Sequence, residues 1–161
     1  MATWTTPKQS WVGDDVVAAS DMNNIGGDLQ FLYDWSGSLG SASVTSSQGS
    51  ITAEVDLTSL TVAVTVPAGG RNIKISAVVP VKTTVATDQA ALYIKESTTY
   101  LQTLYAEFSG TGTDVTIAGF CVVTPSSGSH TYKLAMARAG SGTLTMDAAS
   151  TRPAYILVEA L

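Results

Sequence analysis

Residues 60–81, LTVAVTVPAGGRNIKISAVVPV, alternate apolar and polar side chains on both sides of a glycine-containing turn. The runs from Leu60 to Val66 and from Ile73 to Val81 place an apolar residue at every second position. Because successive side chains of a strand point to opposite faces, this period of two predicts two strands with one buried face each. The Pro-Ala-Gly-Gly segment between them is typical of a hairpin turn.

The same period continues through the chain from residue 51 onward. A run from Ile51 to Leu57 alternates in the same way, and Ser-, Thr- and Gly-rich turns separate the later segments. Further strands are predicted over residues 90–96, 99–108, 113–123, 130–138, 142–148 and 154–160. Eight or nine short strands without a long helical pattern predict a mainly β protein, an antiparallel β-sandwich. A jelly roll is the leading topology and an immunoglobulin-like sandwich is the second.

One short helix is predicted before the sandwich. Ser20 and Asp21 can cap its start, and the apolar residues that follow are spaced three, four and three apart. These residues form a candidate trimer seam that Trp35 extends: Met22, Ile25, Leu29, Leu32 and Trp35. Gly26 and Gly27 each cost about 1 kcal/mol relative to alanine, so the helix needs a partner. That partner is a second copy, a host surface or the chain's own β domain.

The segment before this helix is predicted to be an extended docking arm. All three tryptophans lie in the first 35 residues, and a segment this short cannot bury three large rings by itself. The candidate docking residues are Trp4, Trp11, Val16 and Val17. Five aspartates and one lysine give this region −4 of the chain's net charge of −5, so we expect it to meet a basic surface.

Residues 36–50, with seven serines and three glycines, are predicted to be a flexible linker. The expected organisation is therefore an anchoring arm and helix over 1–35, a linker over 36–50 and a β-sandwich domain over 51–161.

Composition and single reactive residues indicate a structural protein. Charged residues make up 13% of the chain, and the acidic balance without a basic stripe argues against nucleic acid as a partner. No segment has the length and apolarity of a membrane span, and no secretory signal is expected. Cys121 is expected to be a buried, unreactive thiol. His130, the only histidine, has no nucleophile motif around it, so no catalytic residues, metal site or cofactor are predicted.

Four tyrosines of the predicted strands, Tyr93, Tyr100, Tyr105 and Tyr132, have two interpretations. They could form a sugar-binding face, or they could be half-buried strand residues, and we favour the second.

The two ends of the chain resemble structural proteins of tailed bacteriophages. The opening TWTTPKQSWVGDDVVAASDMNNIGGDLQFLYDW is similar to an N-terminal pattern of such virion proteins: Trp, Pro, a second Trp, Gly-Asp-x-Val and a capped helix. The closing HTYKLAMARAGSGTLTMDAASTRPAYILVEAL resembles the end of phage domains with a tumour-necrosis-factor-like jelly roll. The resemblance covers the first 35 and the last 32 residues, 67 of 161. The Gly26-Gly27 pair departs from the pattern.

The resemblance implies a virion component, commonly trimeric, with the arm bound to the particle. We therefore predict a non-enzymatic, homotrimeric capsid decoration protein, made in the host cytoplasm and located in the virion, that docks on the major capsid protein or another virion protein. The alternative is a tail or head fibre module whose sandwich binds host-cell saccharide.

Overall fold

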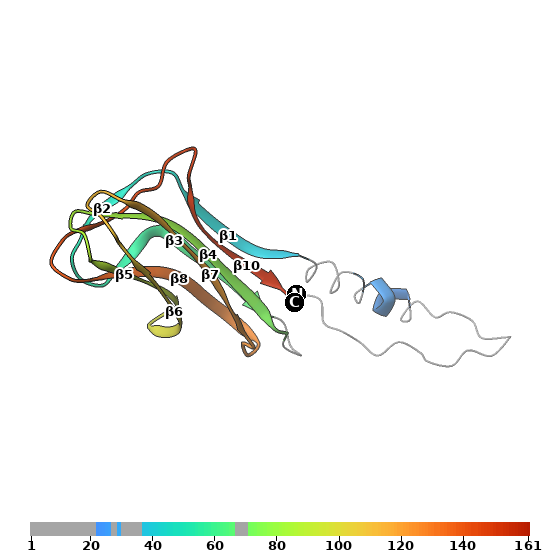
Figure 1. Ribbon diagram of the computed structural model, residues 1–161. Helices are drawn as coiled ribbons and strands as arrows, with labels where there is room; N and C mark the ends of the chain where they lie inside the picture. The colour runs from blue at the N-terminus through green and yellow to red at the C-terminus, as the bar shows by residue number, and fades with distance from the viewer. Residues whose placement is uncertain (1–21, 27–28, 30–36, 67–70) are drawn as a thin grey trace, which may run out of the picture.

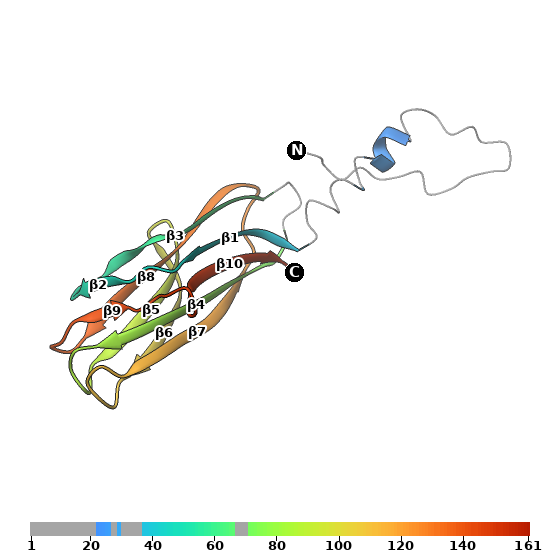
Figure 2. The same cartoon turned by 90° about the horizontal axis from the view of Figure 1, so that it is seen from above.

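The computed structural model describes residues 22–26, 29, 37–66 and 71–161. Within these residues the chain forms ten strands in two antiparallel sheets, seen from two directions in Figure 1 and Figure 2, and one short helix that includes residues 22–26 and 29. The strands are β1 (Ser38–Val44), β2 (Gln48–Ile51), β3 (Val55–Val66), β4 (Ile73–Thr83), β5 (Gln89–Glu96), β6 (Thr99–Glu107), β7 (Asp114–Val123), β8 (Gly128–Ala139), β9 (Leu144–Met146) and β10 (Ala154–Ala160).

The strand pairs are nested in the sequence, and this nesting defines a jelly roll. β1 pairs with β10, β3 with β8, β4 with β7 and β5 with β6, as if one long hairpin had been rolled up. Pairing of β10 with β4 completes one sheet, and pairing of β8 with β5 completes the other, which has the order β3-β8-β5-β6. The short strands β2 and β9 extend the first sheet to six strands.

The core lies between the two sheets and comes from the alternating positions of the strands. In β4, the buried residues Ile73, Ile75, Ala77, Val79 and Val81 are all 0% exposed. Their counterparts on the opposite sheet include Leu92 and Ile94 of β5, and Leu134 and Met136 of β8. Burial of such side chains contributes about 1.5–3 kcal/mol each, so the period of two stabilises the sandwich directly.

Pro80 lies inside β4 at a change of partner strand. Strand β7 pairs with one edge of β4 along nearly its whole length. The other edge of β4 therefore pairs first with β10 and then with β9. The pairing with β10 ends at Val78 and the pairing with β9 begins at Val81. A proline, which has no N–H to donate, is tolerated at this interruption.

The strands predicted from residue 60 onward are confirmed to within a few residues, as is a sandwich of the jelly-roll type. The run from Ile51 to Leu57 is not one strand. Ile51 ends β2, a turn follows, and β3 begins at Val55, which is 38% exposed. A register irregularity between Asp56 and Thr61 then brings Leu57 and Leu60 into the core.

The predicted flexible linker over residues 36–50 is corrected by the structure, because residues 38–44 and 48–51 are strands of the sandwich. β1 pairs with β10 from Ser38 to Val44, and β2 pairs with β9. Leu39, Ala42 and Val44 pack against the core. A serine-rich strand buries little side-chain surface, so its backbone hydrogen bonds to β10 and these three apolar residues hold it in place.

Candidate functional site

Three tyrosines lie on the outer face of the four-stranded sheet, over β5 and β6. The rings of Tyr93 and Tyr100 meet edge to face with centroids 5.0 Å apart, and Tyr105 is 70% exposed. Tyr132 instead points into the core, where it is 0% exposed and desolvation raises its pKa to about 12. A four-tyrosine face is therefore wrong, but three of the four share one surface.

A charged pair crosses this surface beside the tyrosines. Lys95 Nζ lies 2.6 Å from Glu54 Oε1 and 4.6 Å from the centre of the Tyr100 ring, while the Tyr100 hydroxyl donates to Glu54. Hydrogen bonding to Lys95 lowers the pKa of Glu54, and the same bond raises the pKa of Lys95. The pair keeps both groups charged although the Lys95 side chain is only 9% exposed.

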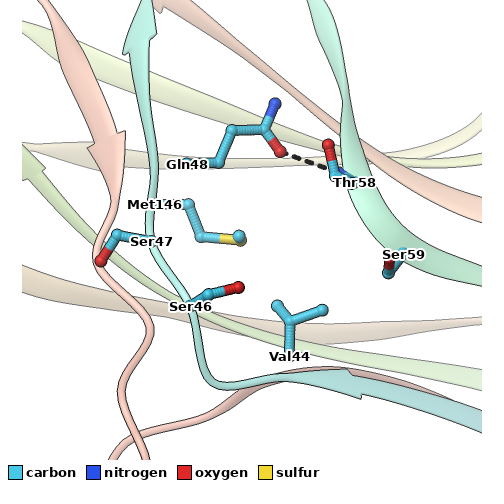
Figure 3. A pocket seen from close by; sticks show the side chains of 7 residues that line it. All are labelled: Val44, Ser46, Ser47, Gln48, Thr58, Ser59 and Met146. Atoms are coloured by element: carbon cyan, nitrogen blue, oxygen red, sulfur yellow. Dashed lines mark hydrogen bonds between the residues drawn. The ribbon is translucent and has the colours of Figure 1, made fainter.

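A hydroxyl-rich hollow lies between β1, β2, β3 and β9 at the other end of β1 from Ser38 (Figure 3). It has a volume of about 210 Å³, and its lining consists of Val44, Ser46, Ser47, Gln48, Thr58, Ser59 and Met146. The Gln48 side chain spans it, because its Oε1 accepts the Thr58 N–H at 2.8 Å and its Nε2 donates to the Asp56 carbonyl. The hollow is smaller than the roughly 300–1,000 Å³ typical of ligand pockets.

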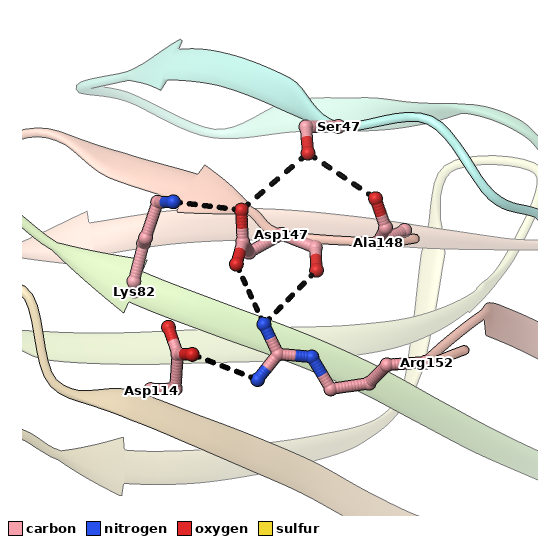
Figure 4. Close-up of polar contacts among 6 residues, drawn as sticks. All are labelled: Ser47, Lys82, Asp114, Asp147, Ala148 and Arg152. Carbon is pink, nitrogen blue, oxygen red and sulfur yellow. Dashed lines mark hydrogen bonds and ion pairs between the residues drawn. The ribbon is translucent and has the colours of Figure 1, made fainter. Parts of the chain in front are cut away.

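An ion-pair network fastens the ends of three strands on the six-stranded sheet (Figure 4). Asp147 lies 2.8 Å from Lys82 Nζ and 2.6 Å from Arg152 Nη2, and Arg152 also contacts Asp114 at 2.9 Å. The hydrogen bond from Lys82 is the main reason that the pKa of Asp147 is lowered. The Ser47 hydroxyl donates to the Ala148 carbonyl, which ties the turn between β1 and β2 to the same network.

The single histidine and cysteine both have structural surroundings. His130 Nδ1 lies 2.6 Å from Glu96 Oε1, and Nε2 lies 2.9 Å from the Ser126 carbonyl, so both ring nitrogens are occupied. Cys121 is buried as predicted, and desolvation raises the pKa of its thiol to about 11. Among the described residues, no three His, Cys, Asp or Glu side chains are grouped to hold a metal ion.

Of the predicted docking and helix-seam residues, the structure describes Met22, Ile25 and Leu29. Trp4, Trp11, Val16, Val17, Leu32 and Trp35 fall outside the described residues. Met22, Ile25 and Leu29 lie on the helix and are 59%, 41% and 62% exposed. No helix among the residues with described placement has the length and apolarity to cross a membrane.

An exposed apolar surface on the outer side of the six-stranded sheet was not among the sites predicted from the sequence. Phe120 and Val122 of β7 are 58% and 48% exposed, and Tyr155 of β10 is 36% exposed. Two runs contained a signal for this surface, because AVVPV within β4 and GFCVV at the end of β7 have apolar residues at both odd and even positions. Such runs indicate strands with two apolar faces.

The fold and these clusters define the class as a jelly-roll β-sandwich. No protein-family model and no curated protein matches the sequence. Among solved structures, the chain is similar to Eiger TNF from S. frugiperda, with 9% identity, a TM-score of 0.42, and coverage of 77% of this chain and 93% of that one.

Two other solved structures show a comparable likeness. One comes from the infectious bursal disease virus Gt strain, with 15% identity and a TM-score of 0.43 over 76% of this chain and 38% of that chain. The other is a carbohydrate-binding module of Cellvibrio mixtus lichenase 5A in complex with cellotriose, with 15% identity and a TM-score of 0.35 over 76% and 97%. With TM-scores below 0.5, these likenesses assign neither a ligand nor a partner to this chain.

Proposed function

We propose that the protein is a non-enzymatic capsid decoration protein of a phage virion, which docks through its N-terminal arm and self-associates as a homotrimer. The observation that carries the proposal is the exposure of Met22, Ile25 and Leu29 on the helix. A short helix gains most of its stability from the packing of its apolar side chains, so three exposed ones favour a second surface that covers them. The sandwich, in contrast, completes its own core from residue 38 onward.

The mechanism is adhesion by several weak contacts at once. Trp4 and Trp11 bury against the major capsid protein or another virion protein, and the trimer brings three arms to the particle together. Once one arm is bound, the other two act at a high effective concentration, so the avidity exceeds the affinity of a single arm. The occupied ring nitrogens of His130 and the raised pKa of Cys121 agree with a protein that needs no nucleophile.

Particle binding by tryptophan variants tests the proposal. Replacing Trp4 or Trp11 with alanine removes an interface ring, which lowers the affinity of one arm by about 30- to 1,000-fold. Asp14→Asn combined with Asp15→Asn is the matched control in the same arm, and we expect it to change mainly the salt dependence. Occupancy of empty particles is measured at matched concentration and two salt levels. Full occupancy by both tryptophan variants would contradict anchoring by these rings.

The second candidate function is a fibre module that binds host-cell saccharide, and the tyrosines of the four-stranded sheet favour it. Tyr105 presents a ring that is 70% exposed, and Tyr100 is 52% exposed beside the Glu54–Lys95 pair. Aromatic rings next to hydrogen-bonding groups suit the apolar and hydroxylated sides of a sugar. Binding of the protein to host cells, and its loss in Tyr105→Ala, would favour this function over decoration.

A further inference from the structure

The outer side of the six-stranded sheet carries an apolar surface. We call it the apolar face, and it consists of Val78, Ala118, Phe120, Val122, Tyr155 and Leu157. Paired residues of neighbouring strands share a face, and the register places Tyr155 and Ala118 on either side of Val78. In the same way, Leu157 and Phe120 flank Ser76. The row of Tyr155, Val78 and Ala118 therefore crosses β10, β4 and β7, while Ser76 separates Leu157 from Phe120.

At both ends of the apolar face, charged side chains form ion pairs with other residues of the same chain. At one end Lys74 pairs with Glu159 at 3.5 Å, and the Lys74 ammonium also lies 5.5 Å from the Phe120 ring centre. At the other end lies the network of Lys82, Arg152, Asp114 and Asp147, which holds two positive and two negative charges (Figure 4). An apolar centre with a polar rim is the usual anatomy of a protein–protein interface.

The charge balance suits a second copy as the partner. Of the net charge of −5, −4 lies in residues 1–35, so the rest of the chain, which bears the apolar face, carries only −1 and two copies repel each other little there. The rim of the apolar face is neutral because each of its charges has a partner on the same chain. A second copy therefore meets no unpaired like charge there, and no oppositely charged partner is required.

The size of the apolar face explains why one such contact does not act alone. Strands about 4.8 Å apart and residues about 3.4 Å apart give it an extent of roughly 15 Å by 20 Å, near 300 Å². A stable pairwise interface buries about 800 Å² on each partner. The face thus needs a second contact, and the exposed helix residues Met22, Ile25 and Leu29 supply one in the same chain, upstream of β1.

We infer that the apolar face is a contact surface between copies of this chain, acting together with the helix seam. This inference rests on the proposed self-association and names a surface for it that is separate from the docking arm. Phe120 is the central residue, since it is the most exposed large side chain of the apolar face.

The oligomeric state of surface variants tests the inference. Phe120→Glu places a charge in the centre of the apolar face, and the matched control Tyr105→Glu places the same charge on the outer face of the other sheet, at a residue that is more exposed. Sedimentation velocity and light scattering of the full chain are measured over a hundredfold range of concentration. We expect the wild type and Tyr105→Glu to form the same oligomer and Phe120→Glu to dissociate at least about 30-fold more readily. Phe120→Leu should keep the oligomer.

Each other outcome overturns the inference. An oligomer that persists in Phe120→Glu places the contact elsewhere, and equal dissociation of both glutamate variants makes the effect nonspecific. A wild-type monomer at every concentration removes the second copy as the occupant. Particle occupancy is measured on the same samples. A monomer that still binds particles through Trp4 and Trp11 leaves the docking proposal standing, whereas loss of particle binding in a Phe120→Glu variant that keeps the wild-type oligomer would make the particle the occupant. Thermal unfolding of each variant verifies that the sandwich is intact.

Discussion

Asp88 accepts a hydrogen bond from the backbone N–H of Gly142, 54 positions later in the chain, at 3.0 Å. The same carboxylate accepts the N–H of Ser141 and the hydroxyl of Thr83, both at 3.0 Å, although Asp88 is only 2% exposed. One side chain thus joins the end of β4 to the turn between β8 and β9. Buried charges persist in proteins where hydrogen bonds of this kind replace water.

Asp88→Ala should destabilise the sandwich by about 2–4 kcal/mol, because it leaves two N–H groups and a hydroxyl without their acceptor. Urea unfolding followed by circular dichroism measures this change. Glu107→Ala is the control, since Glu107 makes a hydrogen bond to Gln89 at an exposed site and its loss should cost less than about 0.5 kcal/mol. Equal effects of the two variants would show that the Asp88 contacts do not hold the turn.

Gly140→Ala should destabilise more than Gly112→Ala. Both glycines have a positive φ, +130° for Gly140 and +71° for Gly112. A φ of +71° lies in the left-handed region and costs an alanine about 1–2 kcal/mol, whereas a φ of +130° lies in a region that residues other than glycine rarely adopt and costs more. At Gly140 the added methyl group would also collide with the Asp88 carboxylate, whereas nothing lies within 4 Å of the methyl at Gly112. The difference between their unfolding free energies measures this collision together with the greater backbone strain at Gly140, and a difference near zero would mean that the turn changes conformation at little cost.

Truncation tests the place of β1 and β2 in the sandwich. A chain of residues 37–161 should unfold cooperatively, because every described strand is kept. A chain that starts at residue 52 loses β1 and β2 and leaves β10 and β9 paired only with β4, and it also loses the apolar contacts of Leu39, Ala42 and Val44. We expect its thermal transition to be much lower or absent. Equal transition temperatures for the two chains would show that residues 37–51 act as a linker and do not stabilise the sandwich.

The stability of the protein should fall as the pH rises above 6.5, because of His130. The hydrogen bond to Glu96 is the main cause that raises the pKa of His130 above its ordinary value of 6.5. A raised pKa in the folded state stabilises the protein fully below pH 6.5 and loses that contribution as the pH rises through the folded-state pKa. Denaturant unfolding at a series of pH values measures the slope. His130→Gln should flatten it, and an unchanged slope would exclude His130 as the titrating group.

Cys121 should react slowly with a thiol reagent at pH 8 in the folded protein. Its pKa of about 11 leaves little thiolate, and its side chain is buried. Stopped-flow labelling in buffer and in denaturant compares the two states, and we expect the unfolded chain to react at least about 100-fold faster. Equal rates would show that β7 opens readily.

The strands from residue 60 onward could be predicted from the sequence because the side-chain period of a strand is a local property. Leu60 to Val66 and Ile73 to Val81 contain their own alternation, and no distant residue is needed to see it. The buried state of Cys121 followed in the same way, from its position among alternating apolar residues.

The role of residues 38–51 could not be read locally. A Ser- and Gly-rich segment has weak intrinsic preference for any structure, so its conformation depends on the partners of its backbone groups. Those partners are in β10, where Val44 pairs with Ala154, 110 residues away. The linker prediction was wrong because the composition of a segment does not reveal which distant strand it pairs with.

The chain by itself therefore determined its strands, its one-sided core and the concentration of tryptophans before them. Only the tertiary structure decided which strands are neighbours, and the surfaces follow from that choice. Phe120 and Tyr155 are far apart in sequence and share one face because β4 lies between their strands. Tyr132 does not lie with the other three tyrosines, because its position in β8 points its side chain toward the core, where it pairs with Val62 of β3. A sheet surface is made of side chains from different strands, so strand order, set by long-range hydrogen bonding and packing, determines what it can bind.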